Sequence, residues 1–371
     1  MDLLFLKDLL LFIIYYYFFH VVGTTDYVKL EDNIMDYINS LKEALIQAGY
    51  GKRYQKLCLE YADNLLNNKL PVIFDNKHLS LLMGVDPSVL GYYILNSDNF
   101  YQEYRVPKSN GDYRILSAPS FNLKSIQRWI LENILYKYQV SDNANGFVLG
   151  KSIKDNAQSH VGKEVVVNID IKDFFPSITF NRVFYLFYNS GYTKEISYTL
   201  TELLTYNEVL PQGSPASPYL ANIICNRLDK RLSGLSSKIN ASYTRYADDI
   251  TFSGEASIIR YIKTLRNIIE SENFSINEDK LRIQKQNSMQ EVTGLIVNNS
   301  VKIKRKYKKT LEQHIYYCKK YGVYSHLEHT GAKNKSYFKE YLYGMAAYIK
   351  MIEPEKGEYF LSNLDEIKWD Y

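Results

Sequence analysis

Two acidic residues stand side by side within a run of strand-forming residues, and this feature constrains the fold more than any other. Asp248 and Asp249 lie between residues 243–247 and 250–252, which are rich in aromatic and β-branched side chains. Burying two adjacent carboxylates costs on the order of several kcal/mol unless cations compensate. We therefore expect a tight β-hairpin whose tip carries the pair towards a cation. A merely exposed turn is the simpler alternative for an Asp-Asp dipeptide.

A further acidic residue follows a strand of different character. Residues 165–171 read VVVNIDI, a nearly continuous β-branched run that is typical of a buried strand, and Asp170 lies near its end. If this strand neighbours the hairpin, Asp170 adds a third carboxylate to the pair. Such a set suits hard divalent ions such as Mg²⁺. Two ions of this kind can activate a 3′-hydroxyl and stabilise a leaving pyrophosphate.

The order of the predicted elements indicates an α+β fold. Hydrophobic spacing predicts amphipathic helices before residue 100, and Asn110-Gly111 predicts a hairpin between two strand-like runs. Helices are expected over 180–190, 196–205 and 218–232, between the two acidic segments. This order favours a palm-like sheet over a doubly wound one. Residues 291–303 predict a small hairpin that turns at Asn298-Asn299.

Composition excludes several classes of protein. The chain has 371 residues, of which 46% are hydrophobic and 23% charged, a balance that excludes disordered, collagenous and coiled-coil proteins. Its three cysteines, Cys58, Cys225 and Cys318, are widely separated. A disulfide framework and a zinc ribbon are therefore not expected, and a cytoplasmic location is favoured.

The N-terminal segment is apolar but short. Residues 9–22 form an apolar run of 14 residues, whereas a spanning helix needs about 20. Lys7 and Asp8 precede it, and no cleavage signal follows it. A membrane contact through residues 3–22, a docking helix and an extension that packs on the body are the alternatives, and we favour the last.

Positive charge is concentrated late in the chain. The net charge is +4, but residues 279–322 contain eleven Lys or Arg against three Asp or Glu. The run from Val301 to Lys309 alone contains six cations. A concentrated basic patch favours a polyanionic partner, although a solvated face would have the same composition.

Three segments, taken together, resemble motifs A, B and C of reverse transcriptases. They are IDIKDFFP at 169–176, Pro-Gln-Gly at 211–213 and YADD at 246–249. The resemblance extends upstream to Lys108 and Arg114 and downstream to residues 277–280, which look like motif D. It covers roughly residues 90–310.

Two further strings resemble signatures of the retron reverse transcriptases. Asn156-Ala157-Gln158-Ser159-His160 is similar to their NAxxH signature, and Val292-Thr293-Gly294 to their VTG signature. Gly146-Phe147 and Arg245 also fit that family. Either string alone is a weak signal, because a lone histidine is more often structural and Val-Thr-Gly suits a strand end.

This resemblance implies a right-hand polymerase fold with fingers, palm and thumb. The expected division is an apolar extension over 1–25, N-terminal helices and fingers over 26–160, palm with part of the fingers over 161–300, and an RNA-binding thumb over 301–371. No RNase H domain is expected after residue 303, because about 70 residues are too few for one.

The resemblance also assigns roles to individual residues. Asp170, Asp248 and Asp249 would be catalytic and would hold two Mg²⁺ ions, with the backbone carbonyl of Ile171 as a further ligand. The expected nucleotide-binding residues are Lys108, Arg114, Phe175, Gln212 and Lys280, with Phe175 excluding a 2′-hydroxyl. The expected RNA-binding residues are Asn156, His160, Val292, Thr293, Gly294, Lys304, Arg305, Lys308 and Lys309.

The function implied by the resemblance is RNA-directed DNA synthesis. Such an enzyme would copy its cognate noncoding RNA (msr-msd) from deoxynucleotides into msDNA, a branched RNA–DNA primed from a 2′-hydroxyl. An effector protein and a role in antiphage defence are implied as well. The alternatives are a group II intron-like or other bacterial reverse transcriptase, and a catalytically silent RNA-binding scaffold. The intact carboxylates of Asp170, Asp248 and Asp249 argue against the scaffold.

Overall fold

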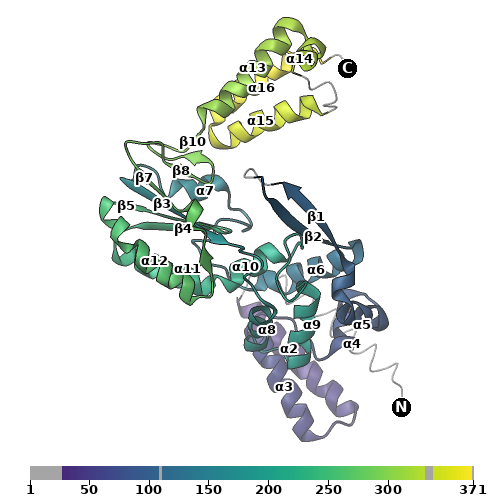
Figure 1. Cartoon of the computed structure of the whole chain (residues 1–371). Coiled ribbons are helices and arrows are strands. Elements are labelled where there is room, and N and C mark those ends of the chain that lie inside the picture. Colours follow the sequence, from purple (N-terminus) through teal and green to yellow (C-terminus); the bar gives the residue numbers. More distant parts are fainter. Residues whose placement is uncertain (1–26, 108–110, 331–336, 370–371) are drawn as a thin grey trace. The chain divides into compact units, whose positions relative to one another are not determined.

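The structure divides into two compact units. This computed structural model describes residues 27–107, 111–330 and 337–369, with only the backbone of 27–33 (Figure 1). One unit comprises the described parts of Met1–Ser141 together with Asp173–Asn226, and the other Asp142–Lys172 together with Arg227–Tyr371. The apolar extension predicted over 1–25 lies outside the described residues. The assignment of ranges to fingers, palm and thumb stays a prediction.

The first unit is built largely of helices. They are α2 (Tyr27–Gln47), α3 (Lys52–Asn67), α4 (Asn76–Met83), α5 (Pro87–Leu95), α6 (Phe121–Asn133), α8 (Phe180–Asn189), α9 (Lys194–Leu204) and α10 (Ser217–Ile224), with the short 3₁₀ helices η1 (Ser97–Phe100) and η2 (Leu135–Lys137). The amphipathic pattern predicted for α2 is confirmed by the burial of Leu41 and Leu45. α5 begins at Pro87, where the side chain of Asp86 accepts a hydrogen bond from the Ser88 amide.

The predicted hairpin in this unit is confirmed. β1 (Tyr101–Pro107) pairs with β2 (Tyr113–Pro119) in antiparallel register. The Pro-Gln-Gly loop packs against β2, because the Ser117 amide donates to the carbonyl of Gln212 at 2.8 Å. At Gly213, φ is +142° and a Cβ atom would lie 2.6 Å from the Ser117 carbonyl oxygen. The glycine is thus required by the close approach to a strand of the same unit.

The second unit contains an antiparallel sheet around β3. Its strands are β3 (Val165–Lys172), β4 (Ser242–Tyr246), β5 (Asp249–Gly254), β6 (Ser275–Ile276) and β7 (Arg282–Lys285). The order is β4-β5-β3-β6, and β7 also pairs with β3. Every residue of β3 except Lys172 is buried, which confirms the buried strand predicted from its β-branched run.

Two helices lie along this sheet. α11 (Asn226–Lys238) and α12 (Ile262–Ser271) follow it in Figure 1, with the 3₁₀ helices η3 (Ala256–Tyr261) and η4 (Glu278–Lys280) between strands. Leu232 of α11, Ile269 of α12, Val167 of β3 and Phe252 of β5 are all buried to at least 99%. This apolar core fixes the strands whose ends carry the acidic residues.

The small sheet after residue 290 differs from the predicted single hairpin. It has three strands, β8 (Glu291–Val292), β9 (Leu295–Ile296) and β10 (Lys302–Ile303), in the order β10-β9-β8. The first turn lies at Thr293 and Gly294, whose φ angles are +45° and +84°. The predicted turn at Asn298-Asn299 is confirmed, since these residues lie between the antiparallel strands β9 and β10. The turn at Thr293 was missed because a β-branched residue seldom adopts a positive φ.

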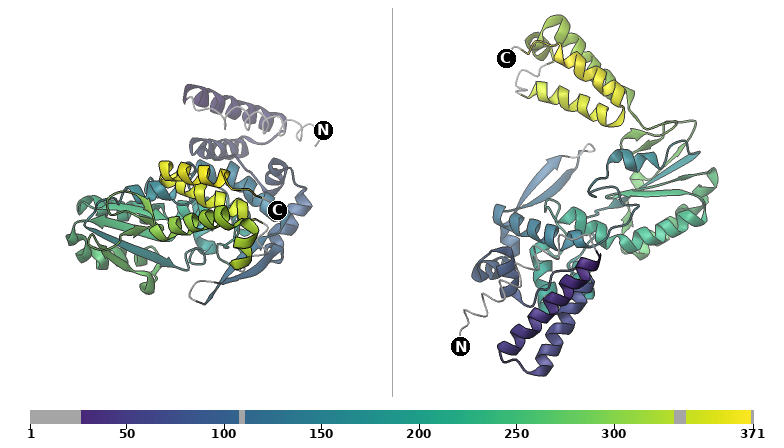
Figure 2. Two further views of the ribbon diagram at one scale, coloured as in Figure 1. Left: turned by 90° about the horizontal axis from the view of Figure 1, so that it is seen from above. Right: turned by 180° about the vertical axis from the view of Figure 1, so that it is seen from behind.

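The last helices pack on this sheet. They are α13 (Arg305–Tyr321), α14 (Val323–His329), α15 (Phe338–Ile352) and α16 (Pro354–Asp365), and Figure 2 shows α13, α15 and α16 grouped together. One hydrophobic cluster joins Leu311, Leu342 and Leu364 to Ala157 of α7 (Ile153–Gln158). Within the described ranges, no helix is both long enough and apolar enough to cross a bilayer.

Candidate active site

The carboxylates predicted to act together lie on neighbouring strands of the second unit. The register of β3 and β5 places Asp170 directly opposite Asp249. Asp248 occupies the turn before β5, and its carbonyl oxygen accepts a hydrogen bond from the Ile171 amide at 3.0 Å. The sheet therefore brings together the ends of two motifs that are almost 80 residues apart in the sequence.

A lysine contacts this acidic group. The Lys280 ammonium lies 2.8 Å from Oδ2 of Asp170. Asp170 is only 6% exposed. Burial alone would lower the pKa of Lys280. The hydrogen bond to Asp170 and the charges of Asp170, Asp248 and Asp249 outweigh that effect and raise the pKa above its usual value. Lys280 therefore stays protonated at neutral pH.

Asp249 is an unusual acid in this group. The residue is exposed at the start of β5, yet desolvation of its carboxyl group by the surrounding protein, followed by repulsion from Asp248 and Asp170, raises its pKa to about 6. Lys280 and Arg282 offset only part of this effect. The carboxylates repel one another, and a positive charge placed among them would relieve that repulsion.

The donor set suits a divalent cation. Carboxylate oxygens are the preferred ligands of Mg²⁺. Desolvation and, after it, the neighbouring carboxylates both disfavour the charged form of Asp249, and a cation would favour it. In the part of the chain that the structure describes, however, no three acidic, histidine or cysteine side chains already form a metal-binding cluster. Asp170 is paired with Lys280 instead. Ion binding would require the side chains of Asp170 and Lys280 to adjust.

The other predicted nucleotide-binding residues belong to the first unit. Arg114 is exposed on β2, opposite Val106 of β1. Phe175 is partly buried, and its ring contacts that of Phe174 edge-on with centroids 5.3 Å apart. Gln212 lies in the loop against β2. Lys108 lies outside the described residues. The nucleotide-binding roles of all these residues stay predictions.

The two retron-like strings meet in the interior of the second unit. The Asn156 side-chain amide donates to Oγ1 of Thr293 at 3.4 Å, and Asn145 donates to Oδ1 of Asn156 at 3.2 Å. Asn156 and Val292 have no exposed surface, whereas Thr293 is partly exposed and Gly294 exposed. Thr293 and Gly294 are therefore accessible for direct contact with RNA. The buried Asn156 and Val292 could affect RNA binding only by holding this turn in place. Their RNA-binding assignments stay predictions.

His160 joins the two strands of the acidic hairpin. Its Nε2 lies 2.8 Å from Oγ1 of Thr244 on β4, and its Nδ1 lies 2.6 Å from Oγ of Ser253 on β5. The ring is fully buried, and this burial lowers its pKa to about 3, with a smaller contribution from Lys163. The neutral imidazole therefore acts as a cross-link between β4 and β5.

We expect His160→Ala to lower the free energy of unfolding by about 2–4 kcal/mol at pH 7, because it leaves a cavity and two unpaired hydroxyls. The folded pKa of His160 lies below the unfolded value, so the wild type loses stability as the pH falls below about 6.5. The difference from the variant should therefore shrink by about 2 kcal/mol at pH 5. Urea unfolding at both pH values measures it. The exposed His329→Ala is the control, and equal stabilities of His160→Ala and the wild type at pH 7 would contradict the cross-link.

The basic run at the start of α13 contains two kinds of cation. Lys304 pairs with Glu291 at 2.6 Å, and Lys308 pairs with Glu353 at 2.7 Å. Lys302, Arg305, Lys306 and Lys309 are exposed. Beside the run, a cavity of about 360 Å³ is lined by Gly294, Ile303, Lys304, Tyr307 and Tyr348. The exposed cations and this cavity are the surfaces of the region that a polyanion can reach.

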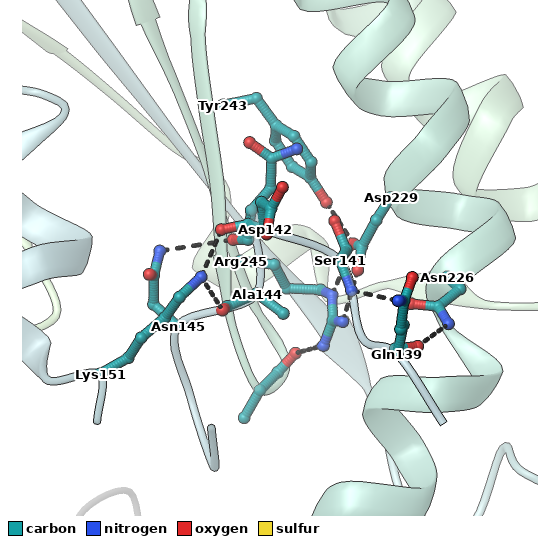
Figure 3. A network of polar contacts seen from close by, with 12 residues as sticks. Gln139, Ser141, Asp142, Ala144, Asn145, Lys151, Asn226, Asp229, Tyr243 and Arg245 are labelled. Atoms are coloured by element: carbon teal, nitrogen blue, oxygen red, sulfur yellow. Dashed lines mark hydrogen bonds and ion pairs between the residues drawn. The ribbon is translucent and has the colours of Figure 1, made fainter. Parts of the chain in front are cut away.

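Sequence reasoning missed a buried ion pair behind the acidic turn. Arg245 of β4 and Asp229 of α11 are both fully buried and bonded to each other (Figure 3). Asp229 gave no signal, because an acidic residue on a helix usually faces solvent. Arg245 did give one, since a cation between Thr244 and Tyr246 in a buried strand needs a partner.

An antiparallel sheet that presents paired carboxylates beside a lysine is compatible with a template-directed nucleotidyltransferase, and the family match shows that class. The sequence profile of the family described as "Reverse transcriptase (RNA-dependent DNA polymerase)" matches residues 106–298, more than half of the chain. The fold is thus the α+β right-hand fold of reverse transcriptases, and the protein is an RNA-directed DNA polymerase.

Similar curated proteins narrow the family. Retron Ec86 reverse transcriptase of Escherichia coli is 39% identical over 272 residues, which is 71% of this chain and 84% of the relative. Retron Mx65 reverse transcriptase of Myxococcus xanthus is 35% identical over 78% of this chain and 71% of the relative. Retron Mx162 reverse transcriptase of the same organism is 33% identical over 81% and 68%. This chain belongs to the retron reverse transcriptases.

Among solved structures, a telomerase from Candida albicans matches with a TM-score of 0.43 and 11% identity, over 72% of this chain and 63% of that one. This structural similarity is too low to support an inference about function. RNA as template and deoxynucleotides as substrates follow from the family instead, and so does the use of divalent metal ions.

Proposed function

We propose that this enzyme copies a cognate structured noncoding RNA into msDNA, starting from a 2′-hydroxyl of that RNA. The observation that carries the proposal is the register of Asp170 opposite Asp249, with Asp248 in the adjoining turn, in a chain that also contains both retron-like strings. The strings support a structured RNA as template, and the carboxylates support the chemistry.

In this proposal Asp170, Asp248 and Asp249 hold two Mg²⁺ ions, together with the carbonyl of Ile171. When bound, the ions lower the pKa of the attacking hydroxyl and balance the charge of the leaving pyrophosphate. Lys280 remains protonated beside Asp170 and adds a positive charge for the pyrophosphate. A bound cation would also offset the desolvation and the carboxylate repulsion that raise the pKa of Asp249.

The incoming deoxynucleotide is assigned to residues of the first unit. Arg114 and Lys108 would bind the triphosphate, for which a guanidinium offers bidentate contact. Gln212 would contact the sugar. Phe175 would exclude a 2′-hydroxyl, which selects deoxynucleotides over ribonucleotides.

RNA binding is assigned to the Thr293-Gly294 turn and to the basic run. The exposed cations Lys302, Arg305, Lys306 and Lys309 are free to contact phosphates without breaking the ion pairs of Lys304 and Lys308. The aromatic rings of Tyr307 and Tyr348 in the adjoining cavity add surfaces on which a base can stack.

The exposed cations and the paired lysines should affect RNA binding and stability differently. Replacing Lys302, Arg305, Lys306 and Lys309 with Gln should flatten the plot of log affinity against log salt by roughly 0.7–0.9 per lost phosphate contact. Replacing Lys304 and Lys308 should instead lower the free energy of unfolding by about 1–3 kcal/mol, because Glu291 loses its paired lysine and Glu353 keeps only Lys356 of its two.

Filter binding of a structured RNA across a salt series, with thermal unfolding of each variant, separates the two effects. The paired-lysine variant serves as the matched control for the exposed one. An unchanged slope in the exposed variant would mean that the basic run is a solvated face and that the RNA binds elsewhere.

We also propose a cytoplasmic location, an effector partner and a role in antiphage defence. The free cysteines Cys58, Cys225 and Cys318 suit a reducing compartment. The effector and the defence role rest on the family resemblance alone.

A product analysis tests the proposed priming. The purified protein is incubated with its copurifying RNA, Mg²⁺ and labelled deoxynucleotides, and the product is treated with ribonuclease. We expect labelled DNA that retains a branched ribonucleotide at its 5′ end. DNA that carries an ordinary 5′ end would contradict 2′-hydroxyl priming, while leaving reverse transcription itself intact.

A further inference from the structure

The turn that carries the acidic pair has an unfavourable backbone conformation. Ala247 has a φ of +56°, which a residue with a Cβ atom adopts only at an energetic cost. The turn has only two residues, Ala247 and Asp248, because Tyr246 pairs with Asp249 in the β4–β5 register. A small change at Ala247 would therefore redirect both carboxylates that follow it.

A buried guanidinium contacts this turn from behind. Nη1 of Arg245 donates to the carbonyl oxygen of Ala247 at 3.1 Å. Its Nε and Nη2 donate to the two carboxylate oxygens of Asp229, each at 2.7 Å. Tyr243 donates its hydroxyl to Oδ1 of Asp229 at 2.6 Å. Three nitrogens of the guanidinium thus bond to fixed acceptors, one of which belongs to the acidic turn.

A second segment contacts both Arg245 and the turn that follows it. The Arg245 amide donates to the carbonyl of Asn143, and the Asn145 amide donates to the carbonyl of Arg245, both at 2.8 Å. A Cβ atom on Gly146 would lie 2.6 Å from the Ala247 nitrogen, so only glycine allows this approach. Residues 143–146 therefore hold the backbone of Arg245 and pack closely against Ala247.

The energetics of a buried ion pair suggest a purpose other than stability. Apolar residues of similar volume usually stabilise an interior at least as well as a buried ion pair does. An apolar pair could not, however, donate a hydrogen bond to Ala247. Neither Arg245 nor Asp229 has any exposed surface, so both charged groups lose their hydration completely. The hydrogen bond to Ala247 is an interaction that this costly arrangement makes possible.

We propose that Arg245, oriented by Asp229, is a positioning residue that fixes the Ala247–Asp248 turn and thereby the orientation of the Asp248 and Asp249 carboxylates. This inference rests on the proposed role of those carboxylates. A displacement of about 1 Å at a reacting group can cost about 100-fold in rate. Partners behind metal ligands are worth about 10–100-fold in metal affinity or activity.

The decisive variant removes the polar group but keeps the volume: Asp229→Leu with Tyr243→Phe and Arg245→Met. We expect it to remain folded, because no buried charge loses its partner. Its kcat for RNA-templated DNA synthesis should fall about 10–100-fold, while the KM for deoxynucleotide changes less than about 3-fold. Binding of Mn²⁺ alone, measured by electron paramagnetic resonance, should weaken about 10-fold.

Two further variants keep the test decisive. Arg245→Lys retains a cation for Asp229 but lacks the planar guanidinium that donates to Asp229 and Ala247 together. Its kcat should therefore fall while its KM stays almost unchanged. This variant provides the test if the triple variant fails to fold. Arg231→Met removes another cation of α11, bonded to Glu272, and should leave kcat unchanged.

A folded triple variant or Arg245→Lys with wild-type kcat and Mn²⁺ affinity would overturn the positioning role. If Asp248→Asn with Asp249→Asn also stayed active, the proposed role of the carboxylates would itself be wrong. The two failures are therefore distinguishable.

Discussion

Replacing both Asp248 and Asp249 with asparagine should lower RNA-templated DNA synthesis at least about 1,000-fold. Neutral amides cannot hold the divalent ions that supply several kcal/mol of transition-state stabilisation, and about 4 kcal/mol corresponds to this factor. Primer extension on an RNA template with Mg²⁺ measures the loss. Binding of the RNA should remain within about 2-fold of the wild type, because no cation is removed.

The same variant should show that its fold is intact. The folded pKa of Asp249 is raised to about 6, so its ionisation destabilises the metal-free protein as the pH rises through that value. With EDTA present, the double variant, which contains Asp249→Asn, should therefore melt at a higher temperature than the wild type at pH 7.5. This difference in melting temperature should be smaller at pH 5. Asp63→Asn, which changes an exposed carboxylate of α3, is the matched control and should be active. Normal extension by the double variant would refute the assignment.

Removing the ring of Phe175 should change the choice of sugar. We expect Phe175→Ala to raise the kcat/KM for a ribonucleotide relative to its deoxynucleotide about 10–100-fold, because the aromatic wall that excludes a 2′-hydroxyl is gone. Discrimination of this kind is worth about 1–3 kcal/mol. Single-nucleotide extension with CTP and dCTP on one template measures the ratio.

Phe175→Tyr provides the control for this experiment, because it keeps an aromatic wall and should keep the ratio of the wild type. An unchanged ratio in Phe175→Ala, at unchanged folding, would mean that the ring serves packing against Phe174. Another residue would then have to exclude the 2′-hydroxyl.

The parts of the fold that depend on local pattern could be predicted from the sequence. The β-branched run at 165–171 predicted the fully buried β3, and the apolar residues around Asp248 predicted a hairpin there. Asp86 and Pro87 are a local signal for the start of α5. In each case a short stretch contains the physical reason, namely side-chain shape, alternation or a capping group.

The remaining features depend on tertiary packing. No local pattern indicates that Asp170 pairs with Asp249, or that Asp229 of α11 faces Arg245. The burial of His160 between two hydroxyls is likewise visible only once β4 and β5 are paired. The turn at Thr293 escaped prediction because its positive φ is held by its surroundings, whereas Asn298-Asn299 offered the stronger local turn signal.

The most direct test of the account is to sequence the nucleic acid that copurifies with the protein. We predict a single structured RNA joined to DNA that is complementary to part of it. The Asp248→Asn, Asp249→Asn variant, purified in parallel, should retain the same RNA without the DNA. Recovery of RNA alone with the wild type, or of the same DNA with the variant, would contradict the conclusion that these carboxylates direct synthesis of DNA on a bound RNA.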